Sequence, residues 1–466
     1  MFKSLKKSNF LKLVVILSAF SFLIFGFEVK SQTELNPLAA SGGKSLLSPI
    51  TLNWWVVWEN PSDFSGLISN FKSVFPQVRV EVKKFRYSEY KDALIRAWAK
   101  DEGPDIFSIT NTWLQEYEEW IEAMPEKVVL KREESSGPGC LNKRKIVSLN
   151  VDLLKTTDIP QKFVSQVKED VIWKGKIWGL PLGFDSMVLY YNRDLLDAAK
   201  IPLPPQNWEE FSDQVRKLVT VDKENNIFQA GTALGTSKNI GRPSDILSLL
   251  MMQVGAKMSD TNGYAIFNKP LTGEANYFPA EEALRFYTDF QDKNKEVYTW
   301  NQDMPQAIEM FVQGKLAFLF GYLYDLPTIK NQAPNLNVGI SKMPQPTGTI
   351  KEVNITNYPV QVVALKSKNK DFAWALLKQA ATKPQDYLSR TKQVTALREL
   401  IGEQVKNPDL EVFANQALTS ISWYHGKNPL LMEEAFAEMI DNVDAGKTTY
   451  QEAINFAVQK INRTIK

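Results

Sequence analysis

Strand-like and helix-like periodicities alternate along the chain from residue 50 onward. The hydrophobic pattern predicts strands over residues 50–57, 78–85 and 104–107, with amphipathic helices over 64–74 and 90–100 between them. This β-α-β-α-β order favours a largely parallel sheet that is covered by helices.

A second run of the same kind follows residue 178. It comprises predicted strands over 187–191, 316–320 and 338–340, and helices over 245–254, 281–290, 304–313 and most of the chain after 370. Asn207 suits the N-cap of another helix, with Glu210 completing a capping box. The weaker, charged pattern over 126–171 indicates a surface insertion. Two α/β lobes are therefore expected.

Length and composition agree with this architecture. A chain of 466 residues exceeds what one core usually supports. Its hydrophobic content of 44% with 23% charged residues is typical of a folded globular protein. The formal net charge is only +2, and no basic stripe stands out, which argues against nucleic acid as a partner.

The N-terminus has the features of an export signal. Lys3, Lys6 and Lys7 precede an apolar run that ends near Phe27, so residues 1–31 are predicted to be a signal peptide or a retained membrane anchor centred on residues 10–27. Residues 32–48 are small and polar and suit a linker. Both alternatives place the bulk of the chain at the extracellular face of the cytoplasmic membrane or in the periplasm.

Cysteine and histidine are almost absent. Cys140 is the single cysteine, so no intrachain disulfide can form, and it lies too far from the signal to carry a lipoprotein anchor. His425 is the single histidine, which argues against histidine-based triads and multi-histidine metal sites. No phosphate-binding or dinucleotide-binding glycine motif is present. We therefore expect no catalytic residue, no metal and no cofactor.

Several segments together resemble the extracellular solute-binding proteins of bacterial ABC importers, the group that includes maltose- and oligosaccharide-binding proteins. The matching pieces, in the order of the family, are Ile50–Trp55, Phe71–Val80, Gly103–Phe107, Gly175–Leu182, Leu189–Leu196, Pro204–Glu210, Gln313–Ala317 and Ser422–Tyr424. The charged stretch over 126–171 and the missing lipoprotein cysteine depart from that pattern.

The resemblance implies a two-lobed periplasmic-binding-protein-like α/β fold, with a mainly parallel sheet in each lobe and a ligand cleft between them. It places the crossings between lobes near residues 183–186, 354–358 and Pro408. Lobe 1 would then comprise 49–184 plus about 357–406, and lobe 2 would comprise 185–356 plus about 407–466. The implied partners are the transmembrane subunits of an ABC permease, and we expect a monomer.

A sugar cleft needs aromatic platforms and a few fixed polar groups, and these belong on loops at the carboxyl ends of strands. In the first lobe the candidates are Trp58, Glu59, Asn111, Thr112 and Trp113. Lobe packing competes for Trp58, and Asn111 or Thr112 could instead cap a helix that begins at Trp113.

The remaining candidates lie on the crossings and in the second lobe. Asp185 occupies a polar position on the first crossing in the family pattern, although a solvated hinge residue is an alternative. Tyr322 and Tyr324 follow a predicted strand end, and Tyr358 lies at the second crossing. Trp423 and Tyr424 match an aromatic platform of the maltose-binding relatives. Core packing competes for each tyrosine.

The sequence thus predicts an exported, non-catalytic protein that captures a small polar solute, a sugar or oligosaccharide, by lobe closure and delivers it to an importer. Three alternatives stay open. The same fold could bind a peptide or polyamine, or serve as a surface receptor. A glycoside hydrolase with two carboxylates is the enzyme alternative that a shortage of histidine leaves possible.

Overall fold

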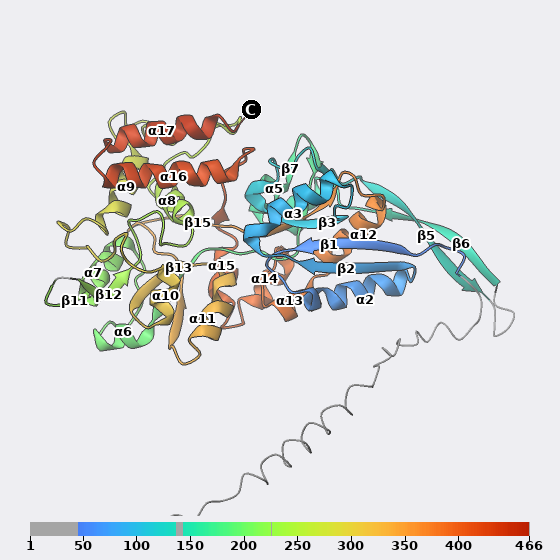
Figure 1. The fold of residues 1–466 in the computed structure, drawn as a ribbon, viewed down its shortest axis with the longest axis horizontal. Helices are drawn as coiled ribbons and strands as arrows, with labels where there is room; N and C mark the ends of the chain where they lie inside the picture. Colours follow the sequence, from blue (N-terminus) through green and yellow to red (C-terminus); the bar gives the residue numbers. More distant parts are fainter. Residues whose placement is uncertain (1–44, 137–142, 225, 466) are drawn as a thin grey trace, which may run out of the picture. The chain divides into compact units, whose positions relative to one another are not determined.

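The computed structural model describes residues 45–136, 143–224 and 226–465, and residues 47–466 form one compact unit. Two sheets organise this unit (Figure 1). The predicted signal or anchor, most of the linker and Cys140 lie outside the described residues. Within the described part, no helix combines the length and apolar character that a membrane span requires.

The first sheet has the strand order β2-β1-β3-β16-β4, with β9 beside β16. Its strands are β1 (Ile50–Val56), β2 (Val78–Lys84), β3 (Ile106–Thr110), β4 (Ile121–Glu122), β9 (Leu180–Pro181) and β16 (Pro359–Ala364). The helices within the predicted bounds of the first lobe are η2 (Pro61–Phe64), α2 (Ser65–Val74), α3 (Tyr87–Ala99), η3 (Asn111–Trp113), α4 (Asp158–Lys162), α5 (Ser165–Val171), α12 (Lys370–Thr382), α13 (Gln385–Thr391) and α14 (Arg398–Gln404). A small hairpin joins β7 (Ile172–Trp173) and β8 (Lys176–Ile177).

The second sheet has the order β11-β12-β13-β10-β14. Its strands are β10 (Val188–Asn192), β11 (Thr220–Val221), β12 (Ile227–Thr232), β13 (Leu316–Gly321) and β14 (Val338–Ser341). The helices within the predicted bounds of the second lobe are α6 (Arg193–Ala198), α7 (Trp208–Leu218), α8 (Pro243–Gln253), α9 (Pro279–Asp289), α10 (Ala307–Val312), η5 (Leu323–Asp325), α11 (Leu326–Gln332), α15 (Glu411–Gln416), α16 (Pro429–Asp444) and α17 (Tyr450–Asn462).

The prediction of a mainly parallel sheet in each lobe is wrong in detail, because both sheets combine parallel and antiparallel strands. β1 is parallel to β2 and β3, but β16 runs antiparallel to β3, β4 and β9. In the second sheet β12 and β13 are parallel, whereas β10 is antiparallel to both β13 and β14. Two strands of one lobe that are joined by a helix run parallel to each other. β10 and β16 follow segments that cross between the lobes, and each enters its sheet in the opposite direction.

The segments that connect the two sheets lie side by side. Phe184 pairs with Val394, and Ser186 pairs with Thr356, in isolated antiparallel bridges. β15 (Asn354–Ile355) and β17 (Ser420–Ile421) form a separate two-stranded parallel ladder. The backbone around two of the predicted crossings is therefore fixed by direct pairing, while the predicted lobe boundaries stay a prediction.

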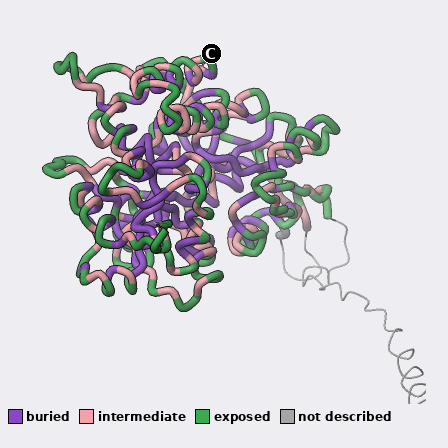
Figure 2. The backbone as a smooth tube through the Cα atoms, turned by 60° about the vertical axis from the view of Figure 1, so that its left-hand side comes forward, coloured by how far each residue is buried: buried purple, intermediate pink, exposed green. Residues whose placement is uncertain are grey.

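Buried residues are concentrated in the interior of the folded part, where the backbone is purple in Figure 2. Gln361, on the central strand β16, is completely buried. Its Oε1 accepts hydrogen bonds from Trp54 Nε1 (2.9 Å) and Ser108 Oγ (2.7 Å). This amide thereby satisfies two polar groups of neighbouring strands that burial would otherwise leave unpaired.

The predicted surface insertion over 126–171 is only partly correct. β5 (Lys127–Ser136) and β6 (Lys143–Asp152) do form a two-stranded antiparallel hairpin outside the main sheets (Figure 1). The rest of the segment belongs to the core, because Ile159, Val167 and Val171 are fully buried. Apolar and charged positions alternate in its short helices. The charged residues made the segment resemble a surface insertion, although one face of these helices is buried.

The predicted N-cap of α7 is confirmed, since Asn207 Oδ1 accepts a hydrogen bond from Glu210 N (2.8 Å). The reciprocal half of the capping box is displaced by one residue, because Glu210 accepts from Gln206 N (2.9 Å). The helix predicted to begin at Trp113 is instead the 3₁₀ turn η3, which begins at Asn111 and has no side-chain cap.

Gly339 on β14 provides a test of the second sheet. An added Cβ would lie 2.0 Å from Cζ of Tyr191, its partner on β10. We expect Gly339→Ala to lower the free energy of unfolding by about 1–3 kcal/mol because the buried ring must move. Denaturant unfolding measures this change.

Gly402→Ala, on α14, is the matched control. A Cβ there meets nothing within 4 Å, and the helix favours alanine. Its stability should be unchanged or higher by up to ~1 kcal/mol. Equal destabilisation of the two variants would contradict the packing of β10 against β14.

Candidate ligand-binding cleft

Two hollows occur where the lobes and the crossing segments meet. The large cavity, of about 710 Å³, takes its lining from both lobes. Its lining residues are Gln115, Gln166 and Glu169 from the first lobe, Met252, Ala256, Met258, Ser259, Asp260, Thr261, Asn262, Gly263 and Ile465 from the second, and Val353, Ile421, Ser422, Trp423 and His425 from the segments between them.

The second hollow, the Asp185 recess, is far smaller, at about 20 Å³. It is lined by Trp58, Thr110, Phe184, Asp185, Tyr324, Asn357, Pro359 and Gln393. Three predicted binding residues, Trp58, Asp185 and Tyr324, therefore come together here, although they are separated widely in sequence. Trp423 lines the large cavity instead.

Asp185 is held at the recess by the second lobe. Its Oδ1 accepts from Leu323 N (3.0 Å) and its Oδ2 accepts from Tyr324 N (3.4 Å). Burial raises the pKa of Asp185 well above its usual value, in spite of these hydrogen bonds. Burial also raises the pKa of the neighbouring Asp325 to about 6. The recess is thus an acidic site with aromatic walls.

Tyr324 and Tyr322 differ in accessibility although both follow β13. Tyr324 is 42% exposed, and its ring stacks on that of Tyr322 at a centroid separation of 5.4 Å. Tyr322 is fully buried and donates its hydroxyl to Asp245 Oδ2 (2.8 Å). Tyr324 therefore offers a face to a ligand, whereas Tyr322 supports it from behind.

Four other predicted residues are buried and already have protein partners. Glu59 accepts from Tyr387 Oη (3.0 Å), and burial raises its pKa. Asn111 donates to Asp170 and accepts from Tyr358 N (3.3 Å), and the Tyr358 hydroxyl also donates to Asp170. The Tyr424 hydroxyl lies 2.7 Å from Thr464 Oγ1. As ligand contacts these residues stay a prediction.

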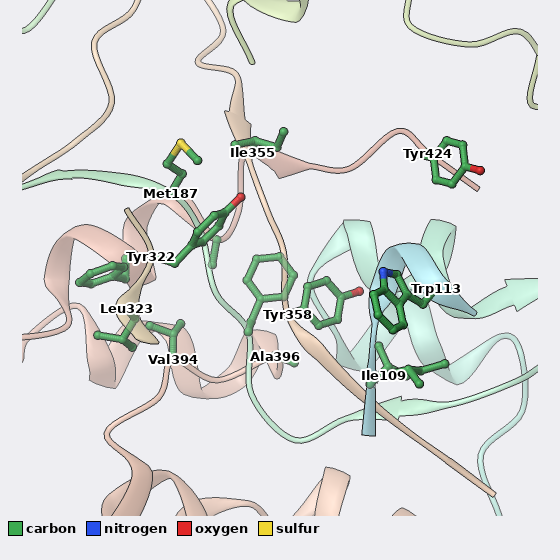
Figure 3. Close-up of a cluster of buried hydrophobic side chains, with 14 of the residues drawn as sticks. Ile109, Trp113, Met187, Tyr322, Leu323, Ile355, Tyr358, Val394, Ala396 and Tyr424 are labelled. Atoms are coloured by element: carbon green, nitrogen blue, oxygen red, sulfur yellow. The ribbon is translucent and has the colours of Figure 1, made fainter. Parts of the chain in front are cut away.

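Thr112 and Trp113 lie in η3, directly after β3. Trp113 is buried and packs against Tyr87 and Tyr117, with ring centroids 5.9 and 6.2 Å apart. Thr112 is half-buried, and its hydroxyl lies 3.3 Å from that of Thr110. Figure 3 shows Trp113 beside Ile109 and near Tyr358, within the apolar junction of the lobes. Trp113 therefore packs among aromatic side chains, and its role as a ligand contact stays a prediction.

The hydrophobic pattern missed the most connected polar group of the cleft, Asp170 on α5. Its side chain is fully buried. Five donors converge on its carboxylate, namely Asn111 Nδ2 (3.1 Å), Gln166 Nε2 (2.7 Å), Tyr358 Oη (2.7 Å), Ser422 Oγ (2.6 Å) and His425 Nε2 (3.1 Å). An ionised carboxylate accepts only, and so many donors compensate the loss of its hydration.

A signal for Asp170 does exist in the sequence. It lies three residues after Val167 and one before Val171, so helical spacing places it beside the buried face of α5. Because its neighbours Lys168 and Glu169 are charged, the pattern indicated that this segment is exposed to solvent.

A second missed cluster surrounds Arg242, at the N-terminus of α8. Its guanidinium binds both oxygens of Asp245 at 2.9 Å and also donates to Glu433 Oε1 (2.6 Å). Arg242 has a left-handed backbone, with φ at 56°. The cluster links α8 to α16, and through Asp245 it reaches Tyr322. It therefore braces the aromatic wall of the recess from the second lobe.

Asp325 provides a pH test of the recess. A carboxyl whose folded pKa is raised binds more protons in the folded state than in the unfolded state, so stability falls as the pH rises from about 4 towards 6. We expect Asp325→Asn, which keeps an acceptor for Tyr322 N, to show a smaller fall than the parent over that range. Thermal unfolding measured from pH 4 to 7 checks this, and parallel curves would contradict the buried position of Asp325.

Among the residues that the structure describes, no group of three His, Cys, Asp or Glu side chains is placed to hold a metal ion. The polar groups of the two hollows are instead amides, hydroxyls, carboxylates and one imidazole. These groups can donate and accept hydrogen bonds with a polar solute.

Known proteins resemble parts of this chain in sequence. A protein of Brucella abortus (strain 2308), described as a binding protein, is 28% identical over 220 residues, which are 46% of this chain and 49% of that protein. The maltotriose-binding protein of Pyrococcus abyssi is 20% identical over 344 residues, covering 71% of this chain and 63% of the relative. The chain thus spans about half to two thirds of the length of these curated relatives.

Solved structures share the fold. A solute-binding protein of Thermotoga lettingae with bound α-D-tagatose has a TM-score of 0.65 at 19% identity, covering 90% of this chain and 100% of that one. The Listeria monocytogenes substrate-binding protein in complex with cycloalternan has a TM-score of 0.66 at 15% identity, covering 90% and 99%. A cyclo/maltodextrin-binding protein with maltotetraose reaches 0.67 at 17% identity, covering 91% and 99%.

These neighbours confirm the expected two-lobed α/β architecture. The sequence model of the bacterial extracellular solute-binding proteins matches residues 66–398, which is most of the chain. A cleft between two lobes, built from discontinuous segments and lined by hydrogen-bonding groups and an indole, is consistent with that match. This chain therefore belongs to the bacterial extracellular solute-binding protein family.

Proposed function

We propose that this protein captures a neutral saccharide in the large cavity and delivers it to an ABC-type importer. The observation that carries the proposal is the lining itself. Six of the lining side chains are amides or hydroxyls and two are carboxylates, Trp423 supplies an aromatic face, and no lysine or arginine is among the described residues that line the cavity. Saccharides present apolar C–H faces beside rings of hydroxyl groups, and this lining offers a partner for each.

The relatives support a sugar as ligand. The Pyrococcus abyssi relative is a maltotriose-binding protein, and the structural neighbours hold tagatose, cycloalternan and maltotetraose. A cavity of about 710 Å³ lies within the range of ordinary ligand pockets. We infer that the ligand is larger than a single sugar ring, since a lining that extends from Gln115 to Ile465 spans both lobes.

Lobe closure is the proposed mechanism of capture. A ligand that contacts Gln115 of the first lobe and Asn262 of the second gains more contacts when the lobes approach each other, and so shifts the population towards the closed form. A membrane permease can then recognise that form. The paired crossing segments around Ser186 and Thr356 are suited to act as the hinge.

We infer that the protein binds without turnover. The family and the fold are those of binding proteins. Glu169 and Asp260 are the carboxylates that line the large cavity, and a glycosidase would need such a pair at a defined separation across a glycosidic bond. Prolonged incubation with maltotriose should leave it intact, and release of shorter sugars would support the hydrolase alternative.

The family is extracellular, and the N-terminal segment provides a route out of the cell. We propose that residues 1–31 direct export and that residues 10–27, if retained, hold the protein at the outer face of the cytoplasmic membrane. A permease in the same membrane would then be within reach of the tethered lobes.

A ligand panel tests the charge preference of the large cavity. Calorimetry with maltotriose, D-tagatose, mannotriose, glucose 6-phosphate, spermidine and a tripeptide should show binding by one or more neutral saccharides. Glucose 6-phosphate should bind at least about tenfold more weakly than the neutral sugars, because no lysine or arginine is among the described lining residues and the carboxylates of Glu169 and Asp260 repel its phosphate. Tight binding of spermidine with no saccharide bound would overturn the sugar assignment.

The aromatic contacts are tested by truncation. Trp423→Ala should weaken saccharide binding by roughly tenfold or more, or ~1.4 kcal/mol, because an aromatic face of the large cavity is lost. Tyr324→Ala should weaken binding comparably only if the ligand reaches the Asp185 recess. Calorimetry measures both changes, and thermal melts confirm that the variants fold.

The matched control is Phe228→Ala, which removes a 63% exposed aromatic side chain of β12 that lines neither hollow. Its affinity should equal that of the parent. Unchanged affinity in Trp423→Ala would exclude Trp423 as a platform.

A further inference from the structure

His425 occupies a special position in the cleft. It is the single histidine of the chain, it lines the large cavity, and its side chain is 26% exposed. Its Nε2 lies 3.1 Å from Asp170 Oδ1. A partly exposed imidazole is thus joined to a fully buried carboxylate at the wall of the ligand cavity.

Asp170 belongs to the first lobe. It lies on α5, whose residues Val167 and Val171 are fully buried, and two of its donors, Asn111 and Tyr358, flank β3 and β16 of the first sheet. Gln166 on the same helix is a third donor. The hydrogen bonds from Asn111 and Tyr358 come from outside the segment that carries His425, whereas Gln166 Nε2 also donates to Ser422 of that segment (3.1 Å to Oγ).

The segment 422–425 is anchored in the second lobe. Trp423 Nε1 donates to Ser248 Oγ on α8 (3.1 Å), and the Trp423 ring packs against Phe267 and Phe436. The Tyr424 hydroxyl lies 2.7 Å from Thr464 Oγ1, beyond the end of α17. The contacts of Ser422 and His425 with Asp170 therefore connect the second lobe to the first across the wall of the cavity.

The charged groups that face His425 are acidic. Asp170 and Glu169 approach it from α5, and Asp260 lines the same cavity from the second lobe. Glu116, after η3, acts on the neighbouring Tyr424. A proton on the imidazole is thus favoured by the carboxylates of Asp170 and Glu169, and no lysine or arginine is among the described residues that line the cavity.

We propose that His425 is a proton-operated latch of the ligand cleft, which holds segment 422–425 against Asp170 when it is protonated and thereby favours the closed lobes and tighter retention of the solute at acidic pH. The link to solute retention rests on the function proposed above. The link to lobe closure does not require a ligand.

The direction of the pH effect follows from the contacts. Burial by itself lowers the pKa of His425, but its hydrogen bond to Asp170, the Asp170 charge and a hydrogen bond to the Trp423 backbone outweigh burial and raise the pKa. An imidazole freed from Asp170 returns towards 6.5. The contact between protonated His425 and Asp170 is therefore fully formed below about pH 6.5. It is lost as the pH rises through the raised pKa of His425.

The test uses the full chain without ligand. The ring protons of the single histidine can be followed by NMR from pH 5 to 9 while X-ray scattering gives the radius of gyration at each pH. We expect the radius of gyration to increase over the pH range in which His425 loses its proton. In His425→Gln, which keeps a neutral donor, the radius of gyration should be constant over that range.

Ser422→Ala is the matched control, because it removes another donor to Asp170 from the same segment but no titratable group. It should loosen the closed form equally at every pH and keep the pH dependence of the parent. The latch is excluded if the parent and His425→Gln have the same radius of gyration at every pH, or if His425 titrates as it does in the unfolded chain.

A second measurement concerns the solute. The Kd for maltotriose should increase from pH 6 to pH 8.5 by about tenfold for each unit by which the pKa is raised in the closed form, and should be flat in His425→Gln. If maltotriose binds at no pH, the choice of sugar fails, and the scattering result decides the latch alone. If the Kd for maltotriose changed with pH in the same way in the parent and in His425→Gln, the proposed role of His425 as a latch would be wrong.

Discussion

A carboxylate removed from water must be surrounded by donors, and the way Asp170 meets this demand holds the cleft together. Its five donors come from α5, from the turn after β3, from the approach to β16 and from the segment beyond β17. These elements belong to both lobes. The hydrogen bonds that the Asp170 side chain needs therefore also connect the two lobes. The large cavity lies directly beside this contact.

The crossing segments explain why the two hollows differ. Where Phe184 and Ser186 pair with Val394 and Thr356, the backbones approach closely, and only the narrow Asp185 recess is left. Trp423 hydrogen-bonds to Ser248 of α8, and the large cavity lies beside Ser422 and Trp423. The same crossings impose the mixed strand directions, since β10 and β16 enter their sheets from the other lobe.

Acidic groups are concentrated at the cleft, and each one is balanced differently. Asp185 is held by backbone amides, Arg242 neutralises Asp245 and Glu433, and Asp170 is bound by side-chain donors, including the imidazole of His425. Backbone amides and guanidinium groups do not change their charge near neutral pH, whereas an imidazole does. The Asp170 contact thus includes a donor whose own charge depends on the pH of the surroundings.

The sequence alone determined the elements and the family. Period-two and period-3.6 patterns are local, so they located β1, β2, α2 and the N-cap of α7, and the order of the motifs along the chain indicated two lobes. The sequence also located Trp58, Asp185 and Tyr324 on loops and crossings, which the folded chain brings together in one recess.

Tertiary structure decided strand direction, and it decided which polar residues are buried. Asp170 lay in a charged stretch that indicated a surface insertion, and His425 was not among the predicted binding residues, because the periodic pattern records apolar faces and not the partners of a polar atom. Those partners lie up to 255 residues away in the chain. Only the folded chain brings a buried acid and a single histidine together at the wall of a cavity.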